Sequence, residues 1–288
     1  MLIGALEAGG TKFKCAVAIS SGEIMKSVVI KTTTIEETMQ KVVNFFLPYH
    51  IEDLGVGCFG PISLDKKSKF YGQILDTPKE KWKYYDIYNY LKDKLNCNVY
   101  INTDVVTSAY GEYYFGFNSL YKNILYFTVG TGIGVGVIYN GNVLQGNHHT
   151  EMGHITINRE KNDDYLSTCE FHDNCLEGLA SGNSLDNRYN LTYEQLENRE
   201  DILKQEAFYL AQGIYAYVLA FAPDKVIIGG GVSHQKKLIP FIREEFKKIN
   251  NGYFHYPLLD DINNFIVEPK LKDDSGLYGA IALAVKKL

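Results

Sequence analysis

The sequence lacks the features that would place a protein in a membrane or on a nucleic acid. It contains no run of 18 consecutive apolar residues, so it encodes no helix of the kind that crosses a bilayer. Its 29 basic and 34 acidic residues give a formal net charge of −5, which leaves no basic surplus for a phosphate backbone. We therefore expect no membrane and no nucleic-acid partner.

Export signals, linkers and low-complexity segments are also missing. The N-terminus enters an apolar segment at Leu2, without a basic stretch or a cleavage site. Five cysteines fit the reduced thiols of a cytoplasmic protein, which is the predicted location. Cys15, Cys58 and Cys97 lie in or beside apolar segments and are expected to be buried core residues.

An internal repeat determines the predicted organisation. Two segments, beginning at Leu2 and Ile124, each read as apolar strand, glycine turn, second strand and tight turn. Their Gly10-Thr11 and Gly130-Thr131 pairs are offset by 120 residues. A chain of 288 residues is also long for a single core, so the repeat predicts two similar α/β domains.

The glycine turns are candidate phosphate sites. Gly9-Gly10-Thr11 and Gly130-Thr131-Gly132 expose backbone N–H groups without side-chain bulk, and such a concavity can hold phosphate oxygens. A plain hairpin is the alternative for either turn alone, and the duplication favours phosphate. Gly229-Gly230-Gly231 follows the predicted strand Lys225–Ile228 and precedes a predicted helix, Ser233–Ile249. That order is typical of a nucleotide-binding turn, or of a tight strand-to-helix connection.

The remaining elements follow from hydrophobic spacing and turn residues. Asp104 stands where a helix N-cap belongs, ahead of Val105–Gly116. The helix Ile202–Phe221 carries an apolar stripe that ends in Leu219, and Arg188–Arg199 reads as polar surface. Trp82 and the tyrosines near it are expected to pack. Further helices are predicted over Thr34–Pro48, Asp86–Leu95 and Gly276–Val285, and further strands over Phe13–Ile19, Ile24–Ile30, Leu54–Phe59, Val99–Ile101, Val135–Tyr139 and Phe265–Val267.

Two thiols and two imidazoles fall within 22 residues. Zinc in a structural site takes four tetrahedral nitrogen and sulfur ligands, and this segment supplies four: His154, Cys169, His172 and Cys175. Cys-x-x-His-x-x-Cys is too open for one helical face, so a loop around an ion fits better. A Cys169–Cys175 disulfide and the absence of any bond are the competing interpretations.

These motifs occur, in the same order, in a known family. The chain resembles the ROK family of repressors and sugar kinases, and within it the bacterial fructokinase branch, from Leu2 to the last helix. The resemblance implies an actin-like (ribonuclease-H-like) α/β fold, duplicated into two domains with a central cleft for ATP and a zinc-binding loop. The expected domains are residues 1–117, with 274–288 packing back on them, and residues 118–273.

The resemblance also implies roles for individual residues. Asp104 matches the catalytic general base, and zinc would be held by His154, Cys169, His172 and Cys175. Glu7 would hold Mg²⁺ through water, with a solvent-facing charge as the alternative. Substrate contacts are assigned to Thr103, Glu151, His154, Glu177, Gly60 and Pro61. Nucleotide contacts are assigned to Gly10, Thr11, Lys12, Thr131, Gly132, Asn183, Gly229, Gly230 and Gly231.

Departures from the wider family narrow the expected substrate. Glu7 replaces the usual aspartate, Thr103 replaces the asparagine before the catalytic aspartate, and zinc has two cysteines and two histidines instead of three and one. All three resemble the fructokinase branch, whereas Asn183 stands where relatives often have proline. The chain begins directly on the first strand, without the repressors' DNA-binding helices.

We therefore expect a homodimeric fructokinase that uses ATP, Mg²⁺ and structural Zn²⁺ to phosphorylate a hexose. A glucokinase or other hexose kinase is the nearest alternative, and a non-catalytic sugar sensor is a second. A third possibility, an ATPase of the same fold, is less favoured because it would not explain the Cys/His loop.

Overall fold

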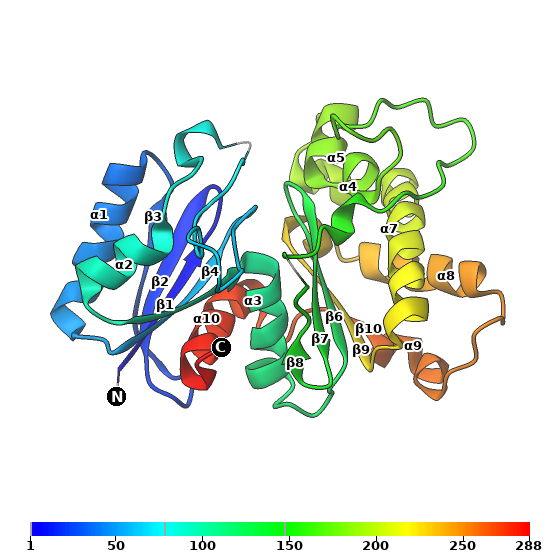
Figure 1. Cartoon of the computed structure of the whole chain (residues 1–288). Helices are drawn as coiled ribbons and strands as arrows, with labels where there is room; N and C mark the ends of the chain where they lie inside the picture. Colours follow the sequence, from blue (N-terminus) through cyan, green and yellow to red (C-terminus); the bar gives the residue numbers. More distant parts are fainter. Residues whose placement is uncertain (1, 78, 147) are drawn as a thin grey trace. The chain divides into compact units, whose positions relative to one another are not determined.

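Figure 1 shows a computed structural model of the chain, which describes residues 2–77, 79–146 and 148–288. The chain forms two compact units. Unit 1 comprises Met1–Leu120, Val143–Thr150 and Asp273–Leu288, and unit 2 comprises Tyr121–Asn142 and Glu151–Lys272. The short segment Val143–Thr150 is connected to unit 1 by Gln145, whose Nε2 donates to the carbonyl of Leu64 at 3.2 Å.

Unit 1 is built on a five-stranded sheet with the order β3-β2-β1-β4-β5. Strands β1, β4 and β5 are parallel, while β2 is antiparallel to both β1 and β3. Its elements are β1 (Ile3–Ala8), β2 (Lys12–Ala18), β3 (Ile24–Lys31), α1 (Ile35–Phe46), β4 (Asp53–Cys58), α2 (Ile87–Leu95), β5 (Asn98–Thr103), α3 (Asp104–Gly111) and α10 (Ser275–Lys286).

The sheet of unit 1 is covered on both faces. Strand residues alternate in direction, so Phe13 and Cys15 pack toward α1 and α2 while Ala16 packs toward α10. The alanine-rich surfaces of the sheet and of α10 allow the helix to pack closely against it. Helix α1 begins at a cap that its sequence specifies, because the Thr34 hydroxyl accepts from the N–H of Glu37 at 3.3 Å.

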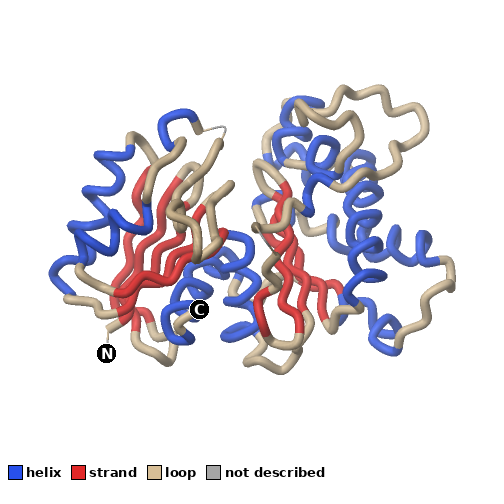
Figure 2. Tube along the Cα trace, in the orientation of Figure 1, coloured by secondary structure: helices blue, strands red, loops and turns tan. Residues whose placement is uncertain are grey.

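Unit 2 repeats the same sheet. Its strand order, β10-β9-β6-β7-β8, corresponds strand for strand to β5-β4-β1-β2-β3, with β6, β9 and β10 parallel and β6 antiparallel to β7. Its elements are β6 (Ile124–Val129), β7 (Ile133–Tyr139), β8 (Asn142–Val143), α4 (Leu176–Ala180), α5 (Gly182–Tyr189), α6 (Tyr193–Glu197), α7 (Glu200–Phe221), β9 (Lys225–Gly229), α8 (Leu238–Asn250), α9 (Ile262–Phe265) and β10 (Ile266–Val267). Figure 2 shows the strands of each unit gathered into one sheet beside its helices. The repeat inferred from the two glycine turns is therefore confirmed.

Several local predictions need correction. Thr103, not Asp104, is the N-cap of α3, and its hydroxyl accepts from Val106 N–H at 3.3 Å. That helix is also shorter than predicted, because its last turn widens into a π-helix over Glu112–Gly116. Leu219 is 43% exposed, although the predicted stripe included it. Arg188 is not surface: its side chain is 6% exposed and pairs with Asp163.

Other predictions about packing are confirmed. Cys15, Cys58 and Cys97 are buried free thiols. Trp82 is buried and its ring meets those of Phe13, Phe59 and Tyr85. Within the described ranges, every helix falls short of the length and apolarity that crossing a bilayer requires.

Candidate functional site

In unit 1 the parallel strands carry the predicted polar residues to one edge of the sheet. Ala8 pairs with Cys58 and Cys58 pairs with Thr103, so β1, β4 and β5 end side by side. Ligands of open α/β sheets bind at the carboxyl ends of such strands. Asp104 is the first residue of α3, and its Oδ1 accepts from the N–H of Val105 at 2.8 Å. Gly60 and Pro61, joined by a cis peptide bond, follow the end of β4.

Glu7 lies at this edge, partly buried beside a lysine. Its Oε2 is 3.6 Å from Lys14 Nζ, and its side chain is 26% exposed, so it is not the solvent-facing charge considered as an alternative. Burial raises the pKa of Glu7; Lys14 opposes this, while Asp104 raises the pKa further. Among the described residues Glu7 Oε2 has no hydrogen-bond partner. A buried carboxylate oxygen near a second carboxylate suits a hard divalent cation or a water bound to it.

Sequence reasoning missed Lys14. The lysine also donates to Asp274 Oδ1 at 3.1 Å and to the carbonyl of Asp273, so it joins Glu7 to the start of α10. The sequence did contain a signal for Lys14, because a lysine within the apolar segment Phe13–Ile19 is unusual on a buried strand.

The first glycine turn closes on itself and on the end of β3. The N–H of Gly9 donates to the carbonyl of Lys12 at 3.0 Å, and the N–H of Thr32 donates to the carbonyl of Thr11 at 2.9 Å. Lys79 lies over Gly10, so close that a Cβ there would stand 2.3 Å from Lys79 Cε. Together with the exposed Lys12, this places positive charge around the turn and supports an anionic ligand. No sequence pattern in the lysine-rich segment singled out Lys79.

In unit 2 the second glycine turn and the Gly229-Gly230-Gly231 turn lie together. Thr128 pairs with Gly229 across β6 and β9, which places both turns at the carboxyl ends of neighbouring strands. Gly230 has a φ of +87°, and a Cβ there would lie 2.5 Å from the Val129 carbonyl oxygen, so only glycine fits.

The start of α5 completes this group. The N–H of Gly182 donates to the carbonyl of Gly130 at 2.7 Å, and that of Asn183 donates to the carbonyl of Thr131 at 3.5 Å. The structure therefore brings together all the nucleotide residues predicted in unit 2. The helix after Gly231 differs from the prediction: a 3-10 turn over Gly231–His234 comes first, and α8 begins only at Leu238.

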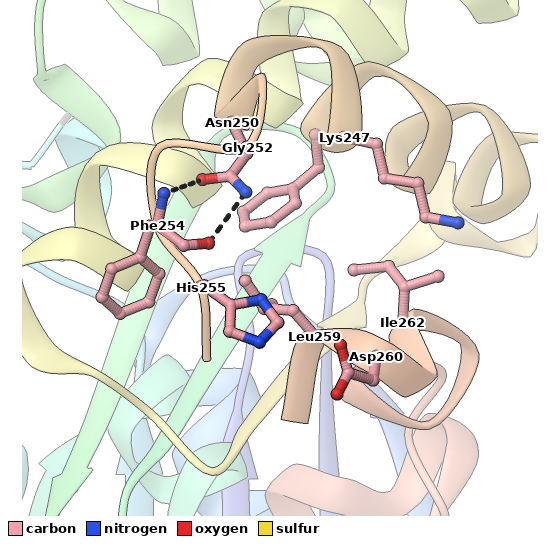
Figure 3. Close-up of a pocket in the computed structure, with 9 residues that line it drawn as sticks. Lys247, Asn250, Gly252, Phe254, His255, Leu259, Asp260 and Ile262 are labelled. Atoms are coloured by element: carbon pink, nitrogen blue, oxygen red, sulfur yellow. Dashed lines mark hydrogen bonds between the residues drawn. The ribbon is translucent and has the colours of Figure 1, made fainter. Parts of the chain in front are cut away.

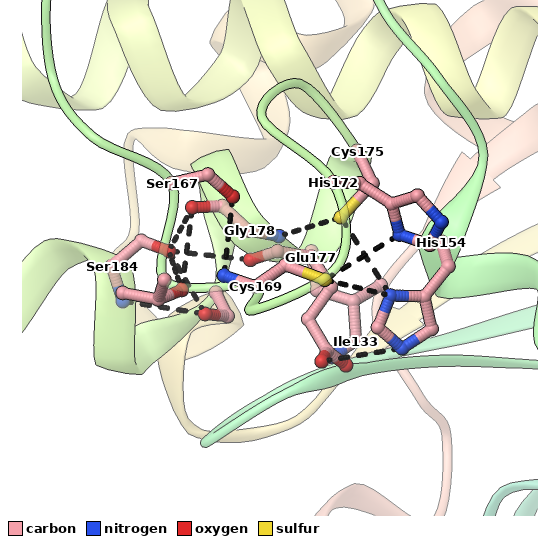
Figure 4. A network of polar contacts seen from close by, with 11 residues as sticks. Ile133, His154, Ser167, Cys169, His172, Cys175, Glu177, Gly178 and Ser184 are labelled. Carbon is pink, nitrogen blue, oxygen red and sulfur yellow. Dashed lines mark hydrogen bonds and ion pairs between the residues drawn. The ribbon is translucent and has the colours of Figure 1, made fainter.

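The four predicted metal ligands converge in a loop of unit 2, as Figure 4 shows. One ligand atom from each of His154, Cys169, His172 and Cys175 lies within 4.8 Å of all the others. The His154 Nδ1 atom is 3.7 Å from Cys169 Sγ and 3.6 Å from Cys175 Sγ, and Cys169 Sγ is 3.5 Å from His172 Nδ1.

These distances match a tetrahedral metal site. Zn–S bonds of about 2.3 Å and Zn–N bonds of about 2.0–2.1 Å place neighbouring ligand atoms about 3.3–3.8 Å apart in a tetrahedron. Both cysteines are free thiols, which contradicts the disulfide alternative. The chemistry and spacing of the donor set therefore fit one metal ion with no position left for solvent.

Glu177 lies beside both His154 and Ile133, the residue that follows the second glycine turn (Figure 4). Its Oε1 is 3.5 Å from His154 Nε2, and its Oε2 accepts from the N–H of Ile133 at 2.8 Å. Glu151 is exposed and precedes the short 3-10 turn that carries His154. Sequence reasoning identified both glutamates but missed the contact with Ile133, which leaves no pattern in the sequence.

A separate cavity of about 250 Å³ lies at the end of α8 (Figure 3). Phe254 is one of the residues that line it, and its backbone carbonyl and N–H form reciprocal hydrogen bonds with the Asn250 side chain at 2.9 and 3.1 Å. None of the predicted site residues lines this cavity. It therefore does not belong to the candidate site.

Comparison with known proteins finds relatives that match nearly the whole chain. The model of the ROK family matches residues 3–287. A fructokinase of Pediococcus pentosaceus is 41% identical over 99% of this chain and 98% of its own length. One of Streptococcus mutans is 38% identical, with the same coverage of both chains. The solved structure of a ROK hexokinase from Thermus thermophilus superposes with a TM-score of 0.81 at 25% identity, covering 100% of this chain and 99% of that one.

The likeness therefore runs along nearly the whole chain and is not confined to one segment. A family model that matches nearly the whole chain, and relatives about 40% identical along nearly their full length, give the same result. The chain belongs to the ROK family.

Proposed function

We propose that this chain is an ATP-dependent fructokinase, which transfers the γ-phosphate of ATP to the 6-hydroxyl of D-fructose. The observation that carries the proposal is the full-length likeness to proteins named fructokinase, at 38–41% identity. The glycine turns, Asp104 and the Cys/His loop are the parts that such a reaction would use.

Phosphoryl transfer depends mainly on positioning and charge stabilisation. The attacking hydroxyl loses its proton as its oxygen bonds to phosphorus, and a carboxylate within hydrogen-bond reach can accept that proton. We assign this role to Asp104. Its Oδ1 accepts from Val105 N–H at the start of α3, which fixes the carboxylate at the end of β5. An anion is favourable at a helix N-terminus, so the ionised form that a base requires suits this position.

The two glycine turns are assigned to the phosphates of ATP, and Gly229, Gly230 and Gly231 to its adenosine. Gly10, Thr11 and Lys12 supply the first turn, with Lys79 as an additional cation near it. Thr131, Gly132 and Asn183 supply the second group. Backbone N–H groups suit phosphate because they donate without the bulk of a side chain.

Hexose contacts are assigned mainly to the residues around the metal group. Glu151 and Glu177 offer carboxylates, and His154 offers the nitrogen that does not face the cysteines. Thr103, Gly60 and Pro61 would add contacts from unit 1. The Thr103 hydroxyl already caps α3, which limits what it can add to the hexose.

Two metals complete the proposal. Zn²⁺ would be bound by His154, Cys169, His172 and Cys175, and with four protein ligands it would be structural. Mg²⁺ would be held near Glu7, where it would neutralise charge on the transferring phosphoryl group.

A comparison of hexoses tests the activity. Purified protein would be assayed with Mg²⁺ and ATP on fructose, glucose and mannose, with the position of the new phosphate determined by NMR. We expect the highest kcat/KM for fructose and phosphate on its 6-oxygen. A higher kcat/KM for glucose or mannose would favour the hexokinase alternative. Failure to phosphorylate any of them, with hexose binding retained, would favour a sensor.

We further propose that the enzyme acts in the cytoplasm as a homodimer, on the basis of its use of ATP and its family resemblance. Light scattering should give about twice the chain mass of 32.6 kDa. A monomer at micromolar concentration would refute the dimer without affecting the proposed reaction.

A further inference from the structure

Glu177 makes contacts that a residue serving only the hexose would not need. One carboxylate oxygen faces His154 Nε2 at 3.5 Å, on the ring whose Nδ1 faces both cysteines. The other oxygen accepts from Ile133 N–H at 2.8 Å, the first N–H after the Gly130-Thr131-Gly132 turn. A single side chain therefore contacts both the metal group and the turn.

The segment that carries His154 also packs directly on Ile133. Gly153, in the 3-10 turn that carries His154, packs so tightly on Ile133 that a Cβ there would lie 1.9 Å from its carbonyl oxygen. The carboxylate also covers Gly132, where a Cβ would lie 2.6 Å from Glu177 Oε2. Both ends of the ligand segment, at His154 and near Cys175, therefore pack on the strand that leaves the turn.

The local backbone gives Glu177 little freedom to move away. Cys175 is the N-cap of α4, and its sulfur accepts from Gly178 N–H at 3.3 Å, while Glu177 is in the first turn of that helix. Leu176 N–H donates to the carbonyl of Ile155 at 2.9 Å, which joins α4 to the His154 side of the loop. The position of a metal ligand therefore determines the position of the carboxylate.

We propose that Glu177 is a positioning residue that couples occupancy of the Cys/His metal group to the order of the Gly130–Gly132 turn. If His154 served as a ligand through Nδ1, its ring proton would lie on Nε2 and would face Glu177 Oε1. This contact holds the carboxylate so that Oε2 accepts from Ile133. Without the metal the ring is released, and the turn loses a charge-assisted hydrogen bond.

The inference deepens the proposed function, because the coupled turn is the one assigned to the phosphates of ATP. It leaves Glu177 able to contact a hexose as well, since an ionised carboxylate offers about four lone-pair positions, whereas the single Nε2 proton of His154 would be shared between Glu177 and the hexose. The metal would then serve the nucleotide side of the reaction as well as the hexose side.

Two variants separate this role from a general effect of charge. In Glu177→Gln the amide keeps one acceptor oxygen and places an NH₂ donor where the other oxygen was. One of the two N–H groups, on His154 or on Ile133, must then lose its acceptor. Glu170→Gln is the matched control: it removes the same charge from an exposed residue next to Cys169.

Amide hydrogen exchange at Ile133 is the direct measurement, on the full chain with and without Zn²⁺ and with no nucleotide or hexose. In the parent and in Glu170→Gln, we expect removal of zinc to accelerate exchange about tenfold, the effect of losing one hydrogen bond to a charged group. In Glu177→Gln, exchange should be fast already and insensitive to zinc. Zinc-independent exchange in the parent overturns the proposal, even if the variant fails to fold.

Metal binding provides a second readout, by competition with a chelator and from the visible spectrum of the Co²⁺ form. Glu177→Gln should bind metal about 10- to 100-fold more weakly, as carboxylate partners of metal-bound histidines commonly do when removed. Its Co²⁺ bands should shift, whereas those of Glu170→Gln should not. Parent-like affinity and bands in Glu177→Gln overturn the proposal. An inactive protein with metal-dependent exchange at Ile133 would contradict the proposed kinase reaction but support this coupling.

Discussion

The two halves of the duplicated fold use the same glycine turn in different surroundings. In unit 1 the turn after β1 is closed by backbone bonds and has Lys12 and Lys79 around it. In unit 2 the turn after β6 is held by the carboxylate of Glu177 and by the start of α5. The repeated sheet provides the frame, and the segments added to each copy determine its chemistry.

Those added segments are also stabilised differently. Unit 1 connects β3 to β4 through α1, and its irregular segment before α2 is held by the rings around Trp82. Unit 2 carries the whole Cys/His loop and α4–α7 between β8 and β9. That loop contains the buried Asp163–Arg188 ion pair and the Cys/His group that could hold a metal, so the two units should respond differently to charge removal, chelation and pH.

The largest difference should appear when one carboxylate of unit 1 is neutralised. Asp104→Asn keeps an oxygen that can accept from Val105 N–H, so the helix start should survive while the proton acceptor is lost. We expect kcat to fall by about 100- to 10,000-fold, with hexose binding and thermal stability close to the parent. Asp93→Asn, on the exposed face of α2, is the control. If Asp104→Asn keeps the turnover of the parent, Asp104 is not the general base.

In unit 2 the corresponding neutralisation should affect folding more than turnover. The side chains of Asp163 and Arg188 are 7% and 6% exposed and meet at 2.9 Å, so Asp163→Asn leaves a buried guanidinium without its carboxylate. We expect a loss of about 3 kcal/mol in the free energy of unfolding, measured by denaturant titration. Asp164→Asn, its exposed neighbour, should cost much less.

The effect of Asp163 should also depend on pH. Burial favours its neutral form, but hydrogen bonds from Tyr209 and the Tyr165 N–H, together with Arg188, outweigh this and lower its pKa from the usual 3.8. A lowered folded-state pKa gives stability above the unfolded value that disappears as pH falls through the folded one. The difference in the free energy of unfolding between the parent and Asp163→Asn should therefore become smaller below about pH 4. A gap that stays constant down to pH 2 would contradict the ionic role.

Removing one of the four Cys/His side chains should destabilise unit 2, which contains them, more than unit 1. At a metal concentration of 100 Kd, binding stabilises a folded protein by about 2.7 kcal/mol, and His172→Ala should lose that metal-dependent part. The hexose KM should rise as well. His255→Ala, another exposed histidine of unit 2, should keep the response to zinc. If chelation leaves both the melting temperature and the KM of the parent unchanged, the loop does not depend on metal.

The two repeated sheets were easier to predict from the sequence than the side-chain contacts between distant segments. Two glycine turns 120 residues apart were enough to predict the repeated sheets, because strand, turn and strand are local patterns. The convergence of His154, Cys169, His172 and Cys175 was also predicted, since Cys and His at close spacing have few other uses. The contact of Glu177 with Ile133 could not be found, because it joins residues 44 apart and one partner is a backbone N–H.

Errors occurred where tertiary contacts override local signals. Asp104 and Thr103 are both good capping residues, and no local signal favours Thr103 over its neighbour. Arg188 lies in a polar segment that reads as surface, but Asp163 and the rings of Tyr165 and Tyr209 enclose it. Such a buried charge becomes visible only when its distant partners are placed.

The smallest expected effect concerns Glu206 on α7. Its side chain is buried, and among the described residues its Oε1 has no hydrogen-bond partner. Burial raises the pKa of Glu206 well above its usual 4.5, against the opposing charge of Arg188. The folded state therefore keeps this proton to higher pH than the unfolded chain does.

Stability from such a group is complete below the unfolded pKa and declines as pH rises toward the folded one. Glu206→Gln removes the titration, so it should be more stable than the parent at pH 7 and equal to it near pH 4. Glu244→Gln, exposed on α8, should follow the parent at both values. Denaturant titrations at the two pH values measure these free energies of unfolding. If the difference between Glu206→Gln and the parent is the same at both pH values, Glu206 keeps an ordinary pKa in the folded protein.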